Sequence, residues 1–174
     1  MKCLIVVDYQ VDFVTGSLGF EKAETIEENI AQKILKYRAD SSDIIFTFDT
    51  HSENYMETSE GKKLPVPHCI KGTSGHNLYG KAAALRSDTD KCIYKPTFGS
   101  DELMKHLRSK NYETVELIGV VTNICVISNA IIAKTALPEA NIIVDAACTA
   151  SNDDALHEAA LDVMQGLQID IINR

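Results

Sequence analysis

Short, largely apolar runs alternate with longer amphipathic stretches, and this alternation constrains the fold of the chain more than any other feature. The first two runs cover residues 3–7 and 43–48, and Ile26, Ile30 and Ile34 recur at helical spacing between them. Strands that are apolar along their length indicate a sheet covered on both faces, and helices between them indicate parallel pairing. We therefore expect an α/β fold of the three-layer α/β/α type.

The same alternation continues to the end of the sequence. Further strands are expected at residues 91–94, 114–120, 141–147 and 168–172. Helices are expected from a cap at Ser100 to residue 109, from 124 to before Pro138, and from a cap at Ser151 or Asn152 to about 165. Residues 50–80 are rich in glycine and proline and predict a long loop, and a loop of this length in a compact domain usually carries function.

Length and charge exclude several classes of protein. The 174 residues suit one domain over residues 1–174, and 45% hydrophobic with 24% charged residues is an ordinary globular composition. A formal net charge of −8 disfavours nonspecific binding to nucleic acid or to anionic membranes. No apolar run is long enough to span a bilayer. We expect neither nucleic acid nor membrane as a partner.

The five cysteines are widely spaced and form no CxxC pair. Their odd number and spacing are typical of neither a disulfide framework nor a zinc ribbon, and they favour a reducing, cytoplasmic location. Cys3, Cys92 and Cys148 lie in or beside apolar runs, where a cysteine is usually a small buried hydrophobic residue. Cys125 differs because it follows a strand and begins a helix.

Polar side chains lie at or just beyond the carboxyl ends of four expected strands. They are Asp8, Asp49, Lys95 and Cys125. Each alone has a structural explanation, such as a helix cap, a turn, a solvated strand end or a buried thiol. Ligands bind at this edge of open parallel sheets. The four residues together therefore predict a functional site.

These residue types suit attack on a carbonyl group by a thiolate. The start of a helix favours negative charge on Cys125, and the ammonium of Lys95 favours the thiolate further. Asp8 can accept the thiol proton and return it to a departing amine. Backbone N–H groups at Val121 and Cys125 are candidates for an oxyanion hole. We expect Asp8, Lys95 and Cys125 to be the catalytic residues.

A second set of side chains has the character of metal ligands. Asp49 and His51 project from the same side of an extended backbone, because side chains alternate along a strand. His68 follows in the long loop, and Glu60 is a candidate fourth ligand. A carboxylate with two imidazoles suits a divalent metal, zinc first, with iron or manganese as alternatives. The remaining histidines are expected to be solvated: His76, His106 and His157.

Four motifs together resemble the isochorismatase-like cysteine hydrolases. They are VVDYQVDF at residues 6–13, FDTH at 48–51 with HCIKGTSG at 68–75, YKPTFGS at 94–100, and GVVTNICV at 119–126. The motifs follow the order of the family and cover nearly the whole chain. The metal loop is similar to that of the nicotinamidase and pyrazinamidase branch.

The resemblance implies a six-stranded parallel sheet and the catalytic and metal-binding roles given above. It also implies a cis peptide bond between Val120 and Val121, and a thioester intermediate on Cys125. The substrate would be a small amide, nicotinamide or pyrazinamide, converted to the acid plus ammonia in pyridine nucleotide salvage. We also expect a homo-oligomer.

The chain contains no tryptophan, whereas nicotinamidases usually place one in the metal loop and near the ring pocket. Residues 64–68 (LPVPH) occupy that stretch here, and Phe13 is expected to pack against a substrate ring. An alternative is another amidohydrolase of the family that acts on a ureido or carbamoyl compound. Lys71 and Arg86 are the only nearby cations for the carboxylate of such a substrate. A third alternative is a noncatalytic binding protein on the same fold.

Overall fold

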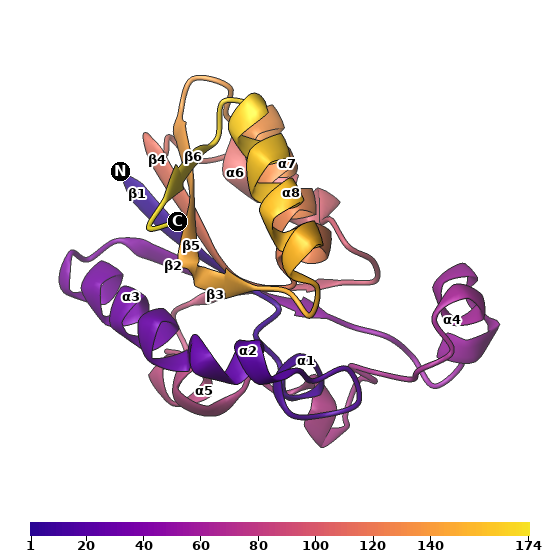
Figure 1. Ribbon diagram of the computed structural model, residues 1–174. Helices are drawn as coiled ribbons and strands as arrows, with labels where there is room; N and C mark the ends of the chain where they lie inside the picture. Colours follow the sequence, from indigo (N-terminus) through magenta and orange to yellow (C-terminus); the bar gives the residue numbers. More distant parts are fainter.

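A sheet of six parallel strands forms the centre of the protein in the computed structural model, which describes residues 1–174. The strand order is β3-β2-β1-β4-β5-β6 (Figure 1). The strands are β1 Lys2–Val7, β2 Asp43–Asp49, β3 Lys91–Lys95, β4 Thr114–Val120, β5 Asn141–Ala150 and β6 Asp170–Ile172. The predicted strands are confirmed. The largest differences are that β5 continues to Ala150 and β6 begins only at Asp170.

Helices cover both faces of the sheet, as the apolar strands predict. In Figure 1, α2, α3 and α5 lie on one side of the sheet, and α6, α7 and α8 lie on the other. Successive residues of β1 enter the two separate cores: Leu4 and Val6 pack on the first side, Ile5 and Val7 on the second. The helices are α1 Val11–Val14, α2 Glu21–Thr25, α3 Glu27–Ala39, α4 Ser59–Lys63, α5 Gly80–Leu85, α6 Asp101–Arg108, α7 Ile127–Ala136 and α8 Asp154–Gly166.

One of the two predicted helix caps is confirmed. The Ser100 side chain accepts a hydrogen bond from the N–H of Leu103 and begins α6. The cap of α8 is Asp153, so the prediction of Ser151 or Asn152 is wrong. Ser151 is buried, and its hydroxyl donates to Asn123 Oδ1 at 2.7 Å. Its side chain therefore does not cap the first turn of α8.

The long segment between β2 and β3 is less irregular than its composition predicts. It contains α4, α5 and two single helical turns, Tyr55–Glu57 and Ser74–His76. In Figure 1, α4 lies on an arm that projects from the body of the molecule. None of the helices is both long enough and apolar enough to cross a membrane.

A buried ion cluster joins α3 to the middle of the sheet. Lys33 Nζ lies 2.6 Å from Glu116 Oε1 and 2.7 Å from Asp145 Oδ2, and the Tyr37 hydroxyl donates to Glu116 Oε2. Both carboxylates are buried, in β4 and β5. Each carboxylate therefore depends on the single ammonium group for its charge compensation.

Replacing Lys33 with methionine is expected to lower the free energy of unfolding by about 3 kcal/mol, since two carboxylates would stay buried without a cation. Urea denaturation followed by circular dichroism measures the change. Lys36→Met is the matched control, because Lys36 is an exposed lysine of the same helix that makes no ion pair. Equal stability of the two variants would contradict this account of the cluster.

Candidate active site

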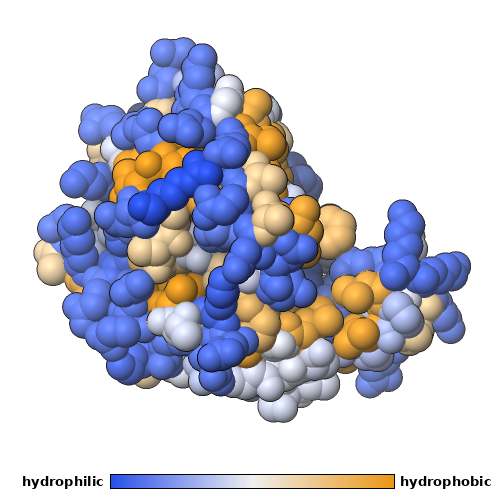
Figure 2. Space-filling view, viewed as in Figure 1, coloured by the Kyte–Doolittle hydropathy of each residue, from blue (hydrophilic) through white to orange (hydrophobic).

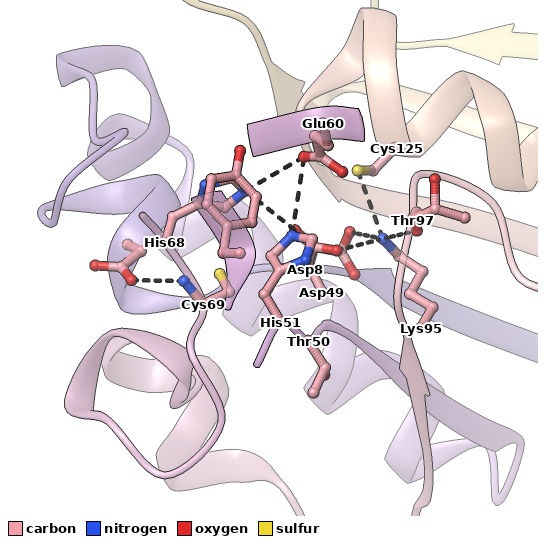
Figure 3. A network of polar contacts seen from close by, with 12 residues as sticks. Asp8, Asp49, Thr50, His51, Glu60, His68, Cys69, Lys95, Thr97 and Cys125 are labelled. Carbon is pink, nitrogen blue, oxygen red and sulfur yellow. Dashed lines mark hydrogen bonds and ion pairs between the residues drawn. The ribbon is translucent and has the colours of Figure 1, made fainter. Parts of the chain in front are cut away.

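The three side chains expected to be catalytic meet at the carboxyl edge of the sheet (Figure 3). Asp8 follows β1, Lys95 ends β3, and Cys125 lies in the turn after β4. Lys95 Nζ is 2.6 Å from Asp8 Oδ2 and 3.6 Å from Cys125 Sγ. All three residues are at least 96% buried, with exposed fractions of 0%, 1% and 4% respectively. The ammonium group therefore lies between a carboxylate and a thiol, out of contact with bulk water.

Neighbouring groups fix the orientation of this trio. The Thr47 hydroxyl donates to Asp8 Oδ1 at 2.6 Å, and Lys95 Nζ donates to the Thr97 carbonyl at 3.0 Å. Sequence reasoning missed Thr47, although a lone polar residue inside an apolar strand is a signal for such a role. Asp8 itself has a φ of 45°, a left-handed conformation that L residues rarely adopt.

The turn that carries Cys125 begins at the predicted cis peptide bond. The bond between Val120 and Val121 is cis, which confirms the expectation. The N–H groups of Ile124 and Val126 both donate to the Val121 carbonyl, at 3.0 and 3.1 Å, and close one wide helical turn before α7. This turn places Cys125 and Val121 in the wall of the same pocket.

Asn129 connects the nucleophile turn to the loop after β3, a role that sequence reasoning missed. Its Nδ2 donates to the carbonyls of Cys125, at 2.8 Å, and Phe98, at 2.9 Å. The side chain is buried in α7, a helix that is otherwise mostly apolar. A buried amide in such a helix is a signal for a polar contact, but its partner cannot be read from the sequence.

Burial acts against ionisation of both acidic groups of the trio. Burial and the nearby carboxylate of Asp8 raise the pKa of Cys125 well above its ordinary value, although Lys95 acts in the opposite direction. Burial likewise raises the pKa of Asp8, against the opposing effect of Lys95. This direction favours the neutral thiol, so attack by the sulfur calls for a base within the site.

The four expected metal ligands also come together. Asp49 ends β2, His51 follows it, Glu60 comes from α4, and His68 lies in the loop beyond. Their candidate ligand atoms all lie within 4.8 Å of one another (Figure 3). His51 Nε2 is 3.0 Å and His68 Nε2 is 3.4 Å from Asp49 Oδ2. The projecting arm that carries α4 thus brings Glu60 close to His51 and His68.

The chemistry of this donor set fits a divalent metal. His68 donates its Nδ1–H to the Val66 carbonyl at 2.8 Å, which leaves Nε2 as an acceptor directed at the carboxylates. Such outer contacts orient metal-binding imidazoles in known sites. Burial raises the pKa of Asp49, but the adjacent imidazoles of His51 and His68 and the charge of Lys95 act in the opposite direction and leave that pKa below its ordinary value. An ionised carboxylate and free imidazole nitrogens are the form that binds zinc, iron or manganese.

Two residues of the opening motif hold this set in place, and sequence reasoning assigned neither of them a role. The Gln10 side-chain amide accepts from the N–H of Asp49 at 2.8 Å and donates to the Asp49 carbonyl at 3.0 Å. Asp12 Oδ2 accepts from the N–H of Cys69 at 2.8 Å. Gln10 and Asp12 therefore position the backbone at Asp49 and directly after His68.

The expectation that the other three histidines are solvated is wrong, since His76, His106 and His157 are all half-buried, and two of them also have a polar partner. His76 is half-buried, its Nε2 is 2.8 Å from Thr50 Oγ1, and its ring lies against Phe48 and Tyr94. His157 is also half-buried, and its Nδ1 is 2.9 Å from Thr122 Oγ1. Both packing partners come from distant parts of the chain, so sequence context did not reveal them.

A pocket of about 200 Å³ lies between the thiol and the metal ligands. It is smaller than the roughly 300–1,000 Å³ typical of sites for drug-sized ligands. The Phe13 ring lies in its wall, 5.5 Å from the ring of His68 between centroids. The other lining residues are Leu18, Phe20, Asp49, Glu60, Leu64, His68, Phe98, Val121, Ile124, Cys125 and Asn152. The pocket therefore suits a small, flat, partly apolar molecule.

Comparison with known proteins finds related sequences and the same fold elsewhere. Residues 2–173 match the family model described as the isochorismatase domain. A protein of Bacillus subtilis described as an uncharacterized isochorismatase family protein, PncA, is 33% identical over 142 residues, which cover 75% of this chain and 76% of that protein. The nicotinamidase/pyrazinamidase of Mycobacterium tuberculosis is 27% identical over 188 residues, which cover 99% of this chain and 98% of that protein.

Solved structures agree with the sequence relatives. The crystal structure of a pyrazinamidase/nicotinamidase from Streptococcus mutans superposes with a TM-score of 0.89 at 34% identity, and the match covers 99% of this chain and 100% of that one. The family model, the relative at 33% identity and this structure all span most of the chain. The chain therefore belongs to the isochorismatase family.

Proposed function

We propose that this protein is a cysteine amidohydrolase that converts nicotinamide, or its analogue pyrazinamide, to the corresponding acid and ammonia. The chain is a hydrolase that acts on amide bonds, and its relatives in M. tuberculosis and S. mutans carry the names nicotinamidase and pyrazinamidase. One observation carries the choice of substrate. A nucleophile set and a metal-ligand set open onto the same small pocket, so one small molecule can reach both.

The proposed reaction begins with Asp8, which takes the proton of the Cys125 thiol as the sulfur attacks the carboxamide carbon. The raised pKa of Asp8 makes it a stronger base than an ordinary carboxylate. Backbone N–H groups at Val121 and Cys125 stabilise the oxyanion of the tetrahedral intermediate. Asp8 then returns the proton to the departing ammonia, which leaves a thioester on Cys125.

Release of the acid uses the same residues. A water molecule gives a proton to Asp8 and attacks the thioester carbon. The C–S bond then breaks, and Asp8 passes that proton to the departing sulfur, which regenerates the thiol and releases the acid. Lys95 lies between Asp8 and Cys125 throughout, where its positive charge favours the ionised form of each. This arrangement explains why a buried ammonium is present at a site that must pass a proton between two acids.

The pocket orients the substrate ring. Asp49, His51 and His68, with Glu60 as a candidate fourth ligand, would hold a divalent metal, zinc or alternatively iron or manganese, and such a metal would supply a Lewis acid to which a ring nitrogen can bind. Phe13 lies in the apolar wall against which the ring packs. A ring held in this way keeps its carboxamide directed at Cys125, and this fixed orientation would speed the attack of the sulfur on the carboxamide carbon.

Removing the metal is therefore expected to lower the activity on nicotinamide strongly while the fold is retained, because its ligands lie at the sheet edge and in the arm rather than in either core. The test is dialysis against a chelator, with ammonia release and circular dichroism measured on the same sample. Added zinc, iron or manganese should restore the rate. Full activity of the metal-free protein would refute this role.

Benzamide has the same shape as nicotinamide but no ring nitrogen, and it provides the matched substrate control. We expect it to react much more slowly with the metal-loaded protein and to show little dependence on the metal. If benzamide and nicotinamide react equally well, docking of the ring nitrogen is wrong, although the cysteine mechanism can still hold.

The pocket itself offers no cation for the carboxylate of a carbamoyl substrate. No lysine or arginine lines the pocket, Lys71 is exposed outside it, and the Arg86 guanidinium lies near Asp88 and Cys92. We therefore favour a substrate without a carboxylate. Hydrolysis of a carbamoyl compound in the absence of any reaction with nicotinamide would reverse this choice. Pyridine nucleotide salvage, a cytoplasmic location and a homo-oligomer stay predictions.

A further inference from the structure

The nucleophile turn, Thr122–Val126, contacts two other parts of the molecule. One is the pocket, whose lining includes Val121 and Cys125. The pocket lies between the projecting arm and the body, where Figure 2 shows a hollow with hydrophobic residues along it. The other is the start of α8, because β4 and β5 stay paired to their carboxyl ends, with Val120 opposite Ala150. The segments that follow these two strands therefore lie side by side.

Two side chains from the segment after β5 hold the first two residues of the turn. Ser151 Oγ donates to Asn123 Oδ1 at 2.7 Å, and His157 Nδ1 lies 2.9 Å from Thr122 Oγ1. His157 is a half-buried residue in the first turns of α8, whereas Thr122 is fully buried. The imidazole is thus the partner that satisfies the buried Thr122 hydroxyl, and loss of the ring would leave that hydroxyl unpaired, which is unfavourable.

The position of Thr122 affects the groups proposed to bind the oxyanion. The Val121 carbonyl belongs to the peptide group that joins Val121 to Thr122, and it accepts the N–H groups of Ile124 and Val126 that close the turn. A shift of Thr122 would therefore change the direction of this carbonyl and move the turn that carries Cys125. An oxyanion hole depends on donors placed within tenths of an ångström of the developing charge.

We propose that His157 is a positioning residue of amide hydrolysis, which acts through Thr122 to hold the N–H groups of Val121 and Cys125 in the orientation that stabilises the oxyanion. This inference rests on the proposed function, since the oxyanion forms only during attack on a carboxamide. His157 has no place in the pocket itself. It lines a separate cavity of about 210 Å³ between α2 and the start of α8, which shares no lining residue with the pocket.

Replacing His157 with leucine in the metal-loaded protein is expected to lower kcat on nicotinamide by about tenfold or more and to change KM by less than about twofold. The reason is that oxyanion contacts form in the transition state, whereas docking of the ring does not involve α8. Steady-state ammonia release measures both constants. A kcat within about twofold of the parent value, or a change confined to KM, would overturn the proposal.

The conservative variant is His157→Asn, whose side-chain amide can reach the position of Nδ1 and bond to the Thr122 hydroxyl. It should keep kcat within about threefold of the parent value. The matched control is His106→Leu, because His106 is a half-buried histidine of α6 that does not line the pocket. Its activity should equal that of the parent. Equal losses in His157→Leu and His157→Asn would show that the hydrogen bond is not the cause, which overturns the proposal.

Alkylation of Cys125 by iodoacetamide separates positioning of the oxyanion donors from general damage to the site. Displacement of iodide uses the sulfur together with Asp8 and Lys95, but it develops no negative charge on a carbonyl oxygen. The alkylation rate in His157→Leu, followed by mass spectrometry of the Cys125 peptide, should therefore stay within about twofold of the parent rate. A fall in alkylation as large as the fall in kcat would mean that His157 supports the nucleophile rather than the oxyanion donors, and the proposal would be wrong.

A double-mutant cycle tests whether His157 acts through Thr122. Thr122→Val removes the other partner of the same hydrogen bond and should also lower kcat by about tenfold. Because both changes break one contact, the combined variant is expected to lose about ten- to twentyfold rather than about a hundredfold. Multiplicative losses would show that the two residues act independently, which contradicts the proposed route.

Failure of the positioning role and failure of the proposed function give different results. If the parent protein hydrolyses nicotinamide and His157→Leu does so equally fast, the positioning role is wrong and the proposed function stands. If the metal-loaded parent releases no ammonia from nicotinamide, the proposed function is wrong and the positioning role falls with it.

Discussion

Replacement of Cys125 with alanine is expected to reduce amide hydrolysis by about 10⁵-fold or more, because a methyl group cannot attack a carbonyl carbon. Ammonia release from nicotinamide measures the loss. The change removes one sulfur atom from a buried position, so the circular dichroism spectrum should remain that of the parent protein. A fully active alanine variant would refute the covalent mechanism.

The matched control is Cys92→Ala. Cys92 is a half-buried cysteine of β3, and it does not line the pocket. Its replacement is expected to leave the rate within about twofold of the parent value, as for most substitutions away from a functional site. Mass spectrometry after rapid acid quench should detect an acyl adduct on the peptide that contains Cys125 and on no other cysteine peptide.

The sheet and the position of the site could be predicted because both depend on local patterns. Most strands are largely apolar runs, and a polar residue at the carboxyl end of such a run lies at one known edge of a parallel sheet. Asp8, Asp49 and Lys95 therefore share an edge however the helices pack. Glu60 was a weaker candidate, since its approach to His68 depends on the path of the arm.

The supporting contacts could not be predicted because they join residues that are distant in the sequence. Gln10 bonds to the backbone of Asp49 across 39 positions, and Asp12 bonds to that of Cys69 across 57. Nothing in the residues around Gln10 specifies that partner. The charges of Asp8 and Lys95 were visible in the sequence, but the burial that raises the pKa of the Cys125 thiol was not.

Replacement of Asp8 with asparagine is expected to lower kcat by about 10³-fold, since an amide cannot accept the thiol proton or return it to ammonia. The side chain keeps its shape and its oxygen can still accept from Thr47. The matched control is Thr47→Val, which removes that hydrogen bond but leaves the carboxylate, and a loss of about tenfold is expected from misorientation alone. A kcat within tenfold of the parent in Asp8→Asn would remove Asp8 from proton transfer.

The leaving group separates the two roles proposed for Asp8. A p-nitrophenyl ester of nicotinic acid has a leaving group that needs no proton, whereas ammonia must be protonated as it departs. If Asp8 acts as both base and acid, Asp8→Asn should lose less activity on the ester than on the amide, because only the thiol deprotonation is impaired. Lys95 would remain beside Cys125 in this variant and would favour its thiolate at high pH. Partial recovery of ester hydrolysis with rising pH is therefore expected, while amide hydrolysis stays low. Equal losses on the two substrates at every pH would mean that Asp8 maintains the structure of the site rather than moving protons within it.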